Sequence, residues 1–394
     1  MADLVALAVP AGDRLVELIV ETWERGMAFA PLDPRLPVER QNELLAAIAP
    51  TQIVRVDTDG SLRRDVMNGG HPVQEGDALV LATSGTGGQP KPVVHTHDSI
   101  RASAFATSEA MMVDPSSDRW LACLPVSHIG GLSVILRSLI TGTPLTVHDG
   151  FEADKVRNAA QREGATLVSL VTRALTQVPA KLFRTVLIGG AAPPPDLPDN
   201  VIPTYGMTET GSGVVYGNRI LDGCEVAILD LDRSPIDQPR GSGRIALRGP
   251  MLFRGYRTAE GGVSAPFFDG GWFDTGDLGH WNDSGDLVVE GRDADVIVTG
   301  GEKVWPAPIE QLLSTRPDIA EIALIGRPDP EWGHRVVAVV VPTDPTSVPS
   351  AESLKESVLE KFPPWFAPKD VVSRNTPLPR TSLGKLRRNE LLRQ

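Results

Sequence analysis

The sequence predicts an α/β protein with a large N-terminal domain, residues 1–292, followed by a small α+β domain, residues 293–394. Three observations support this prediction. Nearly continuous apolar runs alternate with helical stretches over the first half of the chain, which is the pattern of parallel-sheet α/β lobes. From about residue 217, short strand-like runs are split by glycine and proline, which indicates a smaller β-rich lobe. A further change in the pattern of predicted strands and helices falls near Arg292.

The individual elements follow from the spacing of the apolar side chains. Residues 13–25 have helical periodicity, and the helix is expected to end at Gly26. The expected strands of the first half are 78–82, 119–124, 144–148, 165–171 and 184–188, and the expected helices are 98–111, 131–141 and 152–163. The β-rich lobe is expected to hold strands 224–230, 243–248 and 286–290. In the small domain we expect a strand (294–298), a helix (306–314), two strands (319–325, 335–341) and a helix (351–361).

Composition narrows the class of protein. The 394 residues are 41% hydrophobic and 22% charged, as in ordinary globular proteins. The formal net charge of −12 argues against non-specific binding to nucleic acid or to an anionic membrane. Two lone cysteines, Cys123 and Cys224, make neither a disulfide framework nor a zinc site, so we expect a cytoplasmic protein. We expect no signal peptide and no membrane span, because no window approaches the necessary apolar length.

Residues 81–93 carry the most informative local pattern. An apolar run at 78–81 leads into a loop of threonine, serine and glycine that Pro90 and Lys91 close. Such a loop offers hydroxyls, backbone N–H groups and one ammonium to an anion such as a polyphosphate. It is not the Walker pattern, because no Gly-Lys-Ser/Thr follows at the required spacing. A turn of this composition is also common as a simple linker, so the rest of the chain has to decide.

Further motifs follow in a fixed order along nearly the whole chain, at 26–39, 83–91, 124–131, 188–191, 205–210, 272–278, 291–306 and 379–387. With these segments the chain resembles the adenylate-forming enzymes, the superfamily of acyl- and aryl-CoA ligases, peptide-synthetase adenylation domains and luciferases. The resemblance implies an enzyme that uses ATP, Mg²⁺ and coenzyme A on a small-molecule carboxylic acid. It implies no nucleic-acid partner and leaves a homodimer open.

The resemblance also implies a nucleotide site. Its ATP- and AMP-binding residues are expected to be Thr83, Ser84, Gly85, Thr86, Lys91, Gly189, Gly190, Ala191, Tyr205, Gly206, Thr208, Asp277 and Arg292. Glu209 is implied to face the metal and Thr208 the α-phosphate, since Mg²⁺ prefers hard oxygen ligands beside the phosphates. Tyr205 is implied to stack near adenine. The carboxylate of Asp277 can accept hydrogen bonds from both ribose hydroxyls.

Lys385, in the segment Thr-Ser-Leu-Gly-Lys, is implied to be the main catalytic residue, beside Thr208, Glu209 and His128. A positioned ammonium stabilises the charge that develops on the phosphate oxygens in the transition state. A basic C-terminal tail is otherwise usually a solvated end. For the second half-reaction the resemblance implies that the small, mobile C-terminal domain rotates, so that Lys385 leaves and Gly300 and Gly301 line a channel for the thiol. A glycine pair is also an ordinary β-turn, and both interpretations can hold.

Three positions depart from the family pattern. The family usually has threonine where this chain has Gly87, and glycine where it has Pro92. We expect altered pyrophosphate contacts with function retained. Ala294 stands where the family commonly has an aspartate or lysine hinge, so the hinge position stays open.

The segment 124–139 bears on the identity of the acid. Ser127-His128 stands where amino-acid-activating domains usually carry an aspartate, which favours an acid without an α-ammonium group; His128 is then an acyl-pocket wall and gate. This segment and residues 300–306 resemble most closely the o-succinylbenzoate–CoA ligases of menaquinone synthesis. That acid has a second carboxylate, for which Arg137 is a candidate partner, with Ser212 as a further polar contact. Helical spacing places Arg137 opposite His128, so a surface arginine is equally open.

Three other functions remain open from the sequence. The chain fits another aryl- or acyl-CoA ligase or a stand-alone adenylation enzyme that loads a carrier protein, since both use the same thiol chemistry. A non-catalytic binding relative is supported only by Gly87 and Pro92. Lys91, Thr208, Glu209, Asp277 and Lys385, all present, argue against it.

Overall fold

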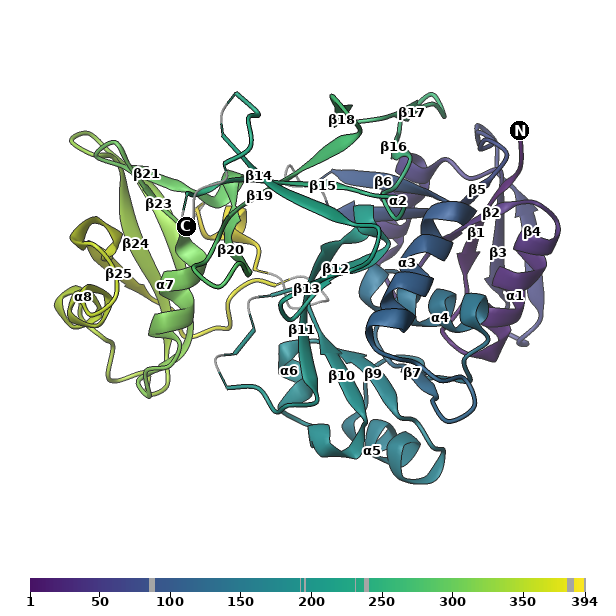
Figure 1. The fold of residues 1–394 in the computed structure, drawn as a ribbon, viewed down its shortest axis with the longest axis horizontal. Coiled ribbons are helices and arrows are strands. Elements are labelled where there is room, and N and C mark those ends of the chain that lie inside the picture. Colours follow the sequence, from purple (N-terminus) through teal and green to yellow (C-terminus); the bar gives the residue numbers. More distant parts are fainter. Residues whose placement is uncertain are drawn as a thin grey trace. The chain divides into compact units, whose positions relative to one another are not determined.

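The computed structural model describes residues 1–84, 89–191, 193–194, 196–230, 232–236, 241–380 and 386–392. The chain divides into two compact units. Unit 1 holds residues 1–226 and 247–273, and unit 2 holds residues 227–246 and 274–394. Figure 1 shows their helices and strands. The predicted α/β class with a smaller α+β C-terminal part is confirmed, whereas the domain boundary after Arg292 stays a prediction.

Unit 1 contains an eight-stranded sheet in the order β17-β16-β6-β5-β2-β1-β3-β4. Its central pairs β5–β2, β2–β1 and β1–β3 are parallel, and the outer pairs are antiparallel. The strands are β1 (Leu4–Ala8), β2 (Ala28–Pro31), β3 (Gln52–Val56), β4 (Leu62–Val66), β5 (Asp77–Ser84), β6 (Pro90–Thr96), β16 (Gly255–Arg257) and β17 (Val263–Ser264).

A second, seven-stranded sheet of unit 1 has the order β13-β12-β11-β10-β9-β7-β8. It is parallel from β8 to β11 and antiparallel beyond. Its strands are β7 (Trp120–Ala122), β8 (Leu145–Val147), β9 (Leu167–Leu170), β10 (Thr185–Ile188), β11 (Val201–Met207), β12 (Ser212–Tyr216) and β13 (Arg219–Ile220). The predicted parallel arrangement is therefore correct for the centres of both sheets.

Helices separate and cover the two sheets, because strands buried on both faces need apolar partners on each side. One core cluster joins Val5 and Leu7 of β1 with Ile100, Leu132 and Trp120, so helices pack between the sheets. Residues of β1 that point the other way join clusters covered by α2, and the far face of the second sheet is covered by α5 and α6. The helices are α1 (Asp13–Glu24), α2 (Val38–Ile48), α3 (His97–Ala110), α4 (Ile129–Thr141), α5 (Ala153–Arg162) and α6 (Thr172–Leu175).

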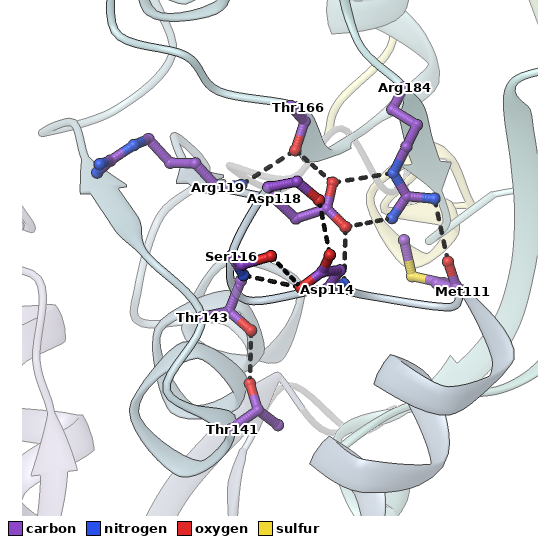
Figure 2. A network of polar contacts seen from close by, with 10 residues as sticks. Met111, Asp114, Ser116, Asp118, Arg119, Thr141, Thr143, Thr166 and Arg184 are labelled. Carbon is purple, nitrogen blue, oxygen red and sulfur yellow. Dashed lines mark hydrogen bonds and ion pairs between the residues drawn. The ribbon is translucent and has the colours of Figure 1, made fainter.

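An ion pair between the buried Asp118 and the exposed Arg184 connects the segment between α3 and β7 to the second sheet (Figure 2). Asp118 accepts hydrogen bonds from Arg184 Nε at 2.9 Å and Nη2 at 2.8 Å, from Thr166 Oγ1 at 2.8 Å and from the Asp114 N–H at 3.0 Å. Arg184 Nη1 donates to the Met111 carbonyl at 3.1 Å. Burial raises the pKa of Asp118, but the hydrogen bonds from Arg184, Asp114 and Thr166 outweigh it and lower the pKa overall.

Two five-stranded sheets complete the chain. The first has the order β14-β15-β19-β18, with β20 beside β19, and several of its strands contain residues of both units. The second, in unit 2, has the order β22-β21-β24-β23, with β25 beside β24. These strands are β14 (Glu225–Leu229), β15 (Gly243–Arg248), β18 (Phe267–Phe268), β19 (Trp272–Trp281), β20 (Leu287–Arg292), β21 (Ile297–Thr299), β22 (Glu302–Val304), β23 (Ile319–Asp329), β24 (Gly333–Pro342) and β25 (Asp370–Ser373). The helices of unit 2 are α7 (Pro306–Leu313), α8 (Ala351–Leu359) and α9 (Arg388–Leu391).

One predicted element is wrong. Residues 293–295 form a short 3-10 helix, and the strand expected at 294–298 begins only at Ile297. The cause is a tertiary contact, because Arg244 of β15 binds Asp293 at 2.5 Å and Asp274 at 2.8 Å, which turns the chain just after β20. None of the described helices is long and apolar enough to cross a membrane.

Candidate active site

The glycine-rich segment connects two antiparallel strands. Thr83 of β5 lies opposite Lys91 of β6, and Thr83 Oγ1 donates to the Lys91 carbonyl at 3.2 Å. Ser84 ends β5, and Pro92 lies within β6 opposite Ala82. The predicted residues Gly85 and Thr86, and the departure at Gly87, lie outside the described residues. Lys91 is thus a strand residue, held by the sheet rather than by the loop.

Lys91 and Glu209 meet at one tyrosine. The Lys91 ammonium lies 5.6 Å from the centre of the Tyr256 ring, and the Tyr256 hydroxyl donates to Glu209 Oε1 at 2.8 Å. A cation over an aromatic face and a phenol on a carboxylate are both favourable contacts. Two residues predicted for phosphate and metal are therefore brought together in unit 1, although 117 positions separate Lys91 from the segment Thr208–Thr210 that carries Glu209.

His95 fixes the backbone beside Glu209. Its Nε2 lies 2.6 Å from the Thr208 carbonyl, which can only accept, so Nε2 carries the proton and donates. Its Nδ1 then accepts from the Ser99 hydroxyl at 3.0 Å. Burial lowers the pKa of the fully buried His95 to about 4, so the ring is neutral at physiological pH. A neutral imidazole thereby holds the predicted α-phosphate residue in place.

The turn between β11 and β12 gives Thr208 and Glu209 their orientation. Residues Thr208–Thr210 form a 3-10 turn that ends at Gly211 in the left-handed region, φ 69°. The Thr210 hydroxyl accepts from the Met207 N–H at 3.0 Å and lies 2.9 Å from its carbonyl, which closes the turn. A side chain at Gly206 would place its Cβ 2.3 Å from the Ser212 carbonyl oxygen. Glycine is needed at Gly206 because the two strands approach closely there.

The remaining unit 1 residues predicted for the nucleotide lie at the end of β10 and on β11. Gly189 packs on Thr204, whose hydroxyl would lie 2.8 Å from an added Cβ. Gly190 has φ 84°, and Ala191 is exposed. Tyr205 lies on β11 opposite Val215, at the start of a register shift.

Arg137 is buried in the core of unit 1, so the alternative of a surface arginine is wrong. Its side chain is 2% exposed, and its guanidinium carbon lies 4.7 Å from the centre of the Trp120 ring. Nη2 donates to Ser212 Oγ at 2.9 Å, so the two predicted acyl-site residues touch. Its Nε and Nη1 are buried and have no hydrogen-bond partner among the described residues. Burial lowers the pKa of Arg137, yet arginine keeps its charge.

The Arg137 cluster, which we define as Arg137, Trp120, Ser212 and Tyr216, has a hydroxyl rim. The Tyr216 hydroxyl lies 3.4 Å from Ser212 Oγ and 3.1 Å from Thr107 Oγ1. Tyr216 is itself 6% exposed. No carboxylate among the described residues is paired with this guanidinium, and a buried cation without an anion is costly for a fold to keep.

His128 caps α4 at its N-terminus and is half-buried. Burial lowers its pKa, and the nearby Asp33 carboxylate opposes this in part. After it, Gly131 approaches the preceding chain so closely that a Cβ would lie 2.4 Å from the Leu124 carbonyl oxygen. The predicted gate residue is thus fixed at the start of a helix whose far end carries Arg137.

In unit 2 the two residues predicted for ribose lie side by side. Asp277 of β19 pairs in register with Arg292 of β20, and Arg292 Nε lies 3.2 Å from Asp277 Oδ1. Asp277 is 7% exposed. Its N–H donates to Thr275 Oγ1 at 3.1 Å, and that hydroxyl donates to the Ile245 carbonyl at 2.7 Å. The sequence placed these two residues in one role, and the sheet brings them together.

The residues predicted for the thiol channel and for catalysis also lie in unit 2. Gly300 and Gly301 form the turn between β21 and β22 with φ 59° and 86°, and Trp332 covers Gly300 so that a Cβ would lie 2.7 Å from its ring. Lys385 lies outside the described residues. The residues on either side of its segment are fixed, because Arg380 and Leu386 form an antiparallel bridge.

The sequence matches two family models, both with the description of AMP-binding enzymes. Residues 67–257 match the AMP-binding enzyme model, and residues 308–385 match the AMP-binding enzyme C-terminal domain. A probable 2-succinylbenzoate–CoA ligase of Mycobacterium tuberculosis (strain CDC 1551 / Oshkosh) is 35% identical over 365 residues, which cover 87% of this chain and 91% of the relative. The chain belongs to the AMP-binding enzyme family.

Other members of the family agree with this assignment. A 2-succinylbenzoate–CoA ligase of Bacillus anthracis (strain A0248) is 31% identical, over 98% of this chain and 87% of its own. The solved o-succinylbenzoate CoA synthetase from Bacillus subtilis, in complex with its acyl-adenylate intermediate, superposes with a TM-score of 0.85 at 27% identity, over 99% of this chain and 88% of that one. The predicted AMP-forming ligase of the adenylate-forming class is confirmed.

The residues of this AMP-binding enzyme fit a metal that arrives with the nucleotide. No group of three or more potential metal ligands lies together among the described residues. Glu209 offers one half-buried carboxylate whose Oε1 is already hydrogen-bonded. Mg²⁺ is usually held in this way, by one or two carboxylates together with substrate phosphates.

Sequence reasoning missed several residues of this AMP-binding enzyme. Tyr256 and His95 touch the predicted Glu209 and Thr208, and Trp120 and Tyr216 surround Arg137. His95 carried a weak signal, since it lies four residues after Lys91. Tyr256 carried none, because it reaches the site only when β16 pairs with β6.

Proposed function

We propose that this chain is an acid–CoA ligase that converts 2-succinylbenzoate, ATP and coenzyme A into the acyl-CoA thioester, AMP and pyrophosphate. Two relatives at 31% and 35% identity carry that name, and a solved structure at 27% identity holds the corresponding acyl-adenylate. Sequence motifs and relatives thus support the same acid independently of the side-chain geometry.

The single observation that carries the proposal is the unsatisfied guanidinium of Arg137. Two of its buried nitrogens have no partner among the described residues, while its third is held by Ser212. A dicarboxylic acid supplies what is missing, since one carboxylate can react while the other brings a negative charge and acceptor oxygens to the guanidinium. A monocarboxylic acid would leave the buried cation unpaired.

The first half-reaction follows from the residues of the nucleotide side. One substrate carboxylate attacks the α-phosphorus in line, the bond to the bridging oxygen breaks, and pyrophosphate leaves. We assign the leaving phosphates to Lys91 and the α-phosphate to Thr208, with Lys385 stabilising the charge that develops on both. Bound Mg²⁺ neutralises phosphate charge, and Glu209 would hold it. Asp277 and Arg292 are proposed for the ribose, and the glycine pair 189–190 with Tyr205 for adenine.

The second half-reaction requires a thiol at the same carbonyl. The thiolate attacks the carbonyl carbon, and AMP leaves with its phosphate oxygen. We propose that residues 293–394 act as a mobile domain, so that Lys385 withdraws and the turn at Gly300 and Gly301 borders the thiol channel. Glycine suits this role because the turn needs positive φ and carries no side chain into the channel.

Location and assembly are extensions of this proposal. Cys123 and Cys224 are both free thiols, and burial raises the pKa of each to about 12, which suits unreactive structural cysteines. With ATP and coenzyme A as substrates, we propose a cytoplasmic enzyme. We propose a homodimer, to be tested by light scattering of the purified protein.

The proposed function is tested by ATP–pyrophosphate exchange with a panel of acids. We expect exchange with 2-succinylbenzoate, and much less with benzoate, with fatty acids and with amino acids. Thioester formation with free coenzyme A, compared with transfer to a carrier protein, then identifies the acceptor. Exchange only with fatty acids would refute the assignment of the acid, and transfer only to a carrier protein would refute the CoA ligase.

A further inference from the structure

Tyr256 contacts two residues of the proposed nucleotide site and has been given no role so far. Its ring centre lies 5.6 Å from the Lys91 ammonium, and its hydroxyl donates to Glu209 Oε1 at 2.8 Å. The phenol therefore lies between the cation proposed for the leaving phosphates and the carboxylate proposed for the metal. A substitution of Tyr256 therefore affects the surroundings of both groups.

The fold keeps Tyr256 in one position. It pairs with Val93 in the β16–β6 ladder, and its ring packs edge-on against Phe253 with centres 4.9 Å apart. The same segment also holds the backbone of Glu209, because the Phe253 N–H donates to the Glu209 carbonyl at 2.8 Å. Glu209 is thus held at its main chain by Phe253, just before β16, and at its side chain by Tyr256 of β16.

We propose that Tyr256 is a positioning residue that orients Glu209 as a one-oxygen ligand for the magnesium–ATP complex. The inference rests on the proposed function. A neutral phenol donates one hydrogen bond, which occupies Oε1, fixes the plane of the carboxylate and leaves Oε2 for the metal. Partners that orient a metal ligand commonly change metal affinity by about 10-fold or more when they are removed.

The test compares Tyr256→Phe with the wild-type protein by calorimetric titration of ATP at a series of Mg²⁺ concentrations. We expect the half-saturating Mg²⁺ concentration to rise about 10-fold, since the phenol is an outer partner of the metal ligand. ATP binding in EDTA is expected to stay unchanged, because the phenylalanine ring still faces Lys91. The thermal midpoint without ligand and thioester formation from supplied acyl-adenylate should also stay at the wild-type level.

Two further variants separate positioning from packing. In a Glu209→Gln background, Tyr256→Phe should add no further loss of Mg²⁺ affinity, because the two act through one contact. Tyr256→Leu, which also removes the ring, should weaken ATP binding in EDTA as well.

Wild-type Mg²⁺ dependence in Tyr256→Phe would overturn the inference, and so would an equal loss of ATP affinity with and without Mg²⁺. If the wild-type chain bound Mg²⁺ and ATP but catalysed no exchange with any acid, the proposed function alone would fail.

Discussion

Two buried charged groups of unit 1 differ in how completely their hydrogen-bonding atoms are paired. Asp118, 4% exposed, accepts hydrogen bonds from Thr166, from the Asp114 N–H and from two nitrogens of Arg184 (Figure 2). Arg137, 2% exposed, has one hydrogen bond to Ser212 and two buried nitrogens without a partner among the described residues. Asp118 and Trp120, the aromatic partner of Arg137, lie on the same short stretch of chain.

The difference distinguishes a charge that the protein itself pairs from a charge that we assign to the substrate. A satisfied ion pair holds its surroundings together, and removing one partner leaves an uncompensated buried charge. A buried cation without an anion is costly for the fold, and we propose that the acid substrate brings the negative charge to Arg137. Burial accordingly lowers the pKa of Arg137, whereas hydrogen bonds lower the pKa of Asp118 despite its burial.

The largest effect is expected at a third charge, Lys385, which we assign to the reacting phosphate itself. Lys385→Ala should reduce adenylation by about 1,000-fold or more, because it removes charge stabilisation in the transition state. Thioester formation from supplied acyl-adenylate should stay largely intact. Separate assays of the two half-reactions measure this. Equal losses in both would show that Lys385 is not specific to adenylation.

The next effect sharpens the contrast at Arg137 itself. Arg137→Met should lower kcat/KM for 2-succinylbenzoate by about 100-fold, the order of a lost buried charge pair. It should leave kcat/KM for acids such as benzoate unchanged, since these acids have no second carboxylate. Exchange kinetics with both acids give the ratio. An equal loss of kcat/KM for benzoate would mean that Arg137 shapes the pocket without binding the second carboxylate.

A matched substitution tests stability. Arg184→Met should lower the free energy of unfolding by about 2 kcal/mol, below the range for fully buried pairs because the Arg184 side chain is 39% exposed. Arg137→Met should not lower it, because a methionine of similar volume replaces an unpaired cation. Urea unfolding of the two variants measures both values. If Arg137→Met is the more destabilising of the two, the contrast between the charges fails.

The smallest effect is the acid sensitivity of the Asp118 pair. The pKa of Asp118 is lowered in the folded protein, so its contribution to stability is present above the ordinary aspartate pKa. That contribution is lost as the pH falls through the lowered value, where the folded carboxylate takes up its proton. Asp118→Asn should therefore unfold with a shallower dependence on pH below about 4 than the wild-type protein. Identical slopes in urea melts would contradict this.

Much of the proposed site could be predicted from local sequence because its members lie in short motifs. Thr208 and Glu209 follow a strand end, and Asp277 and Arg292 flank a hairpin, so their neighbours along the chain identified them. Tyr256, His95 and Trp120 could not be found in this way. They reach their partners across sheets or between a strand and a helix, and such long-range contacts leave no local pattern.

The sequence by itself determined the fold class, the order of the motifs and the chemical types present, because periodicity and turn chemistry act over a few residues. Tertiary structure alone decided whether Arg137 lay on the surface or in the core, since its helix buries nearly its whole circumference between two sheets. It likewise decided that residues 293–295 turn before β21 begins, because Arg244 reaches Asp293 from a distant strand. Burial and pairing depend on which distant segments meet, and that is settled only when the chain packs.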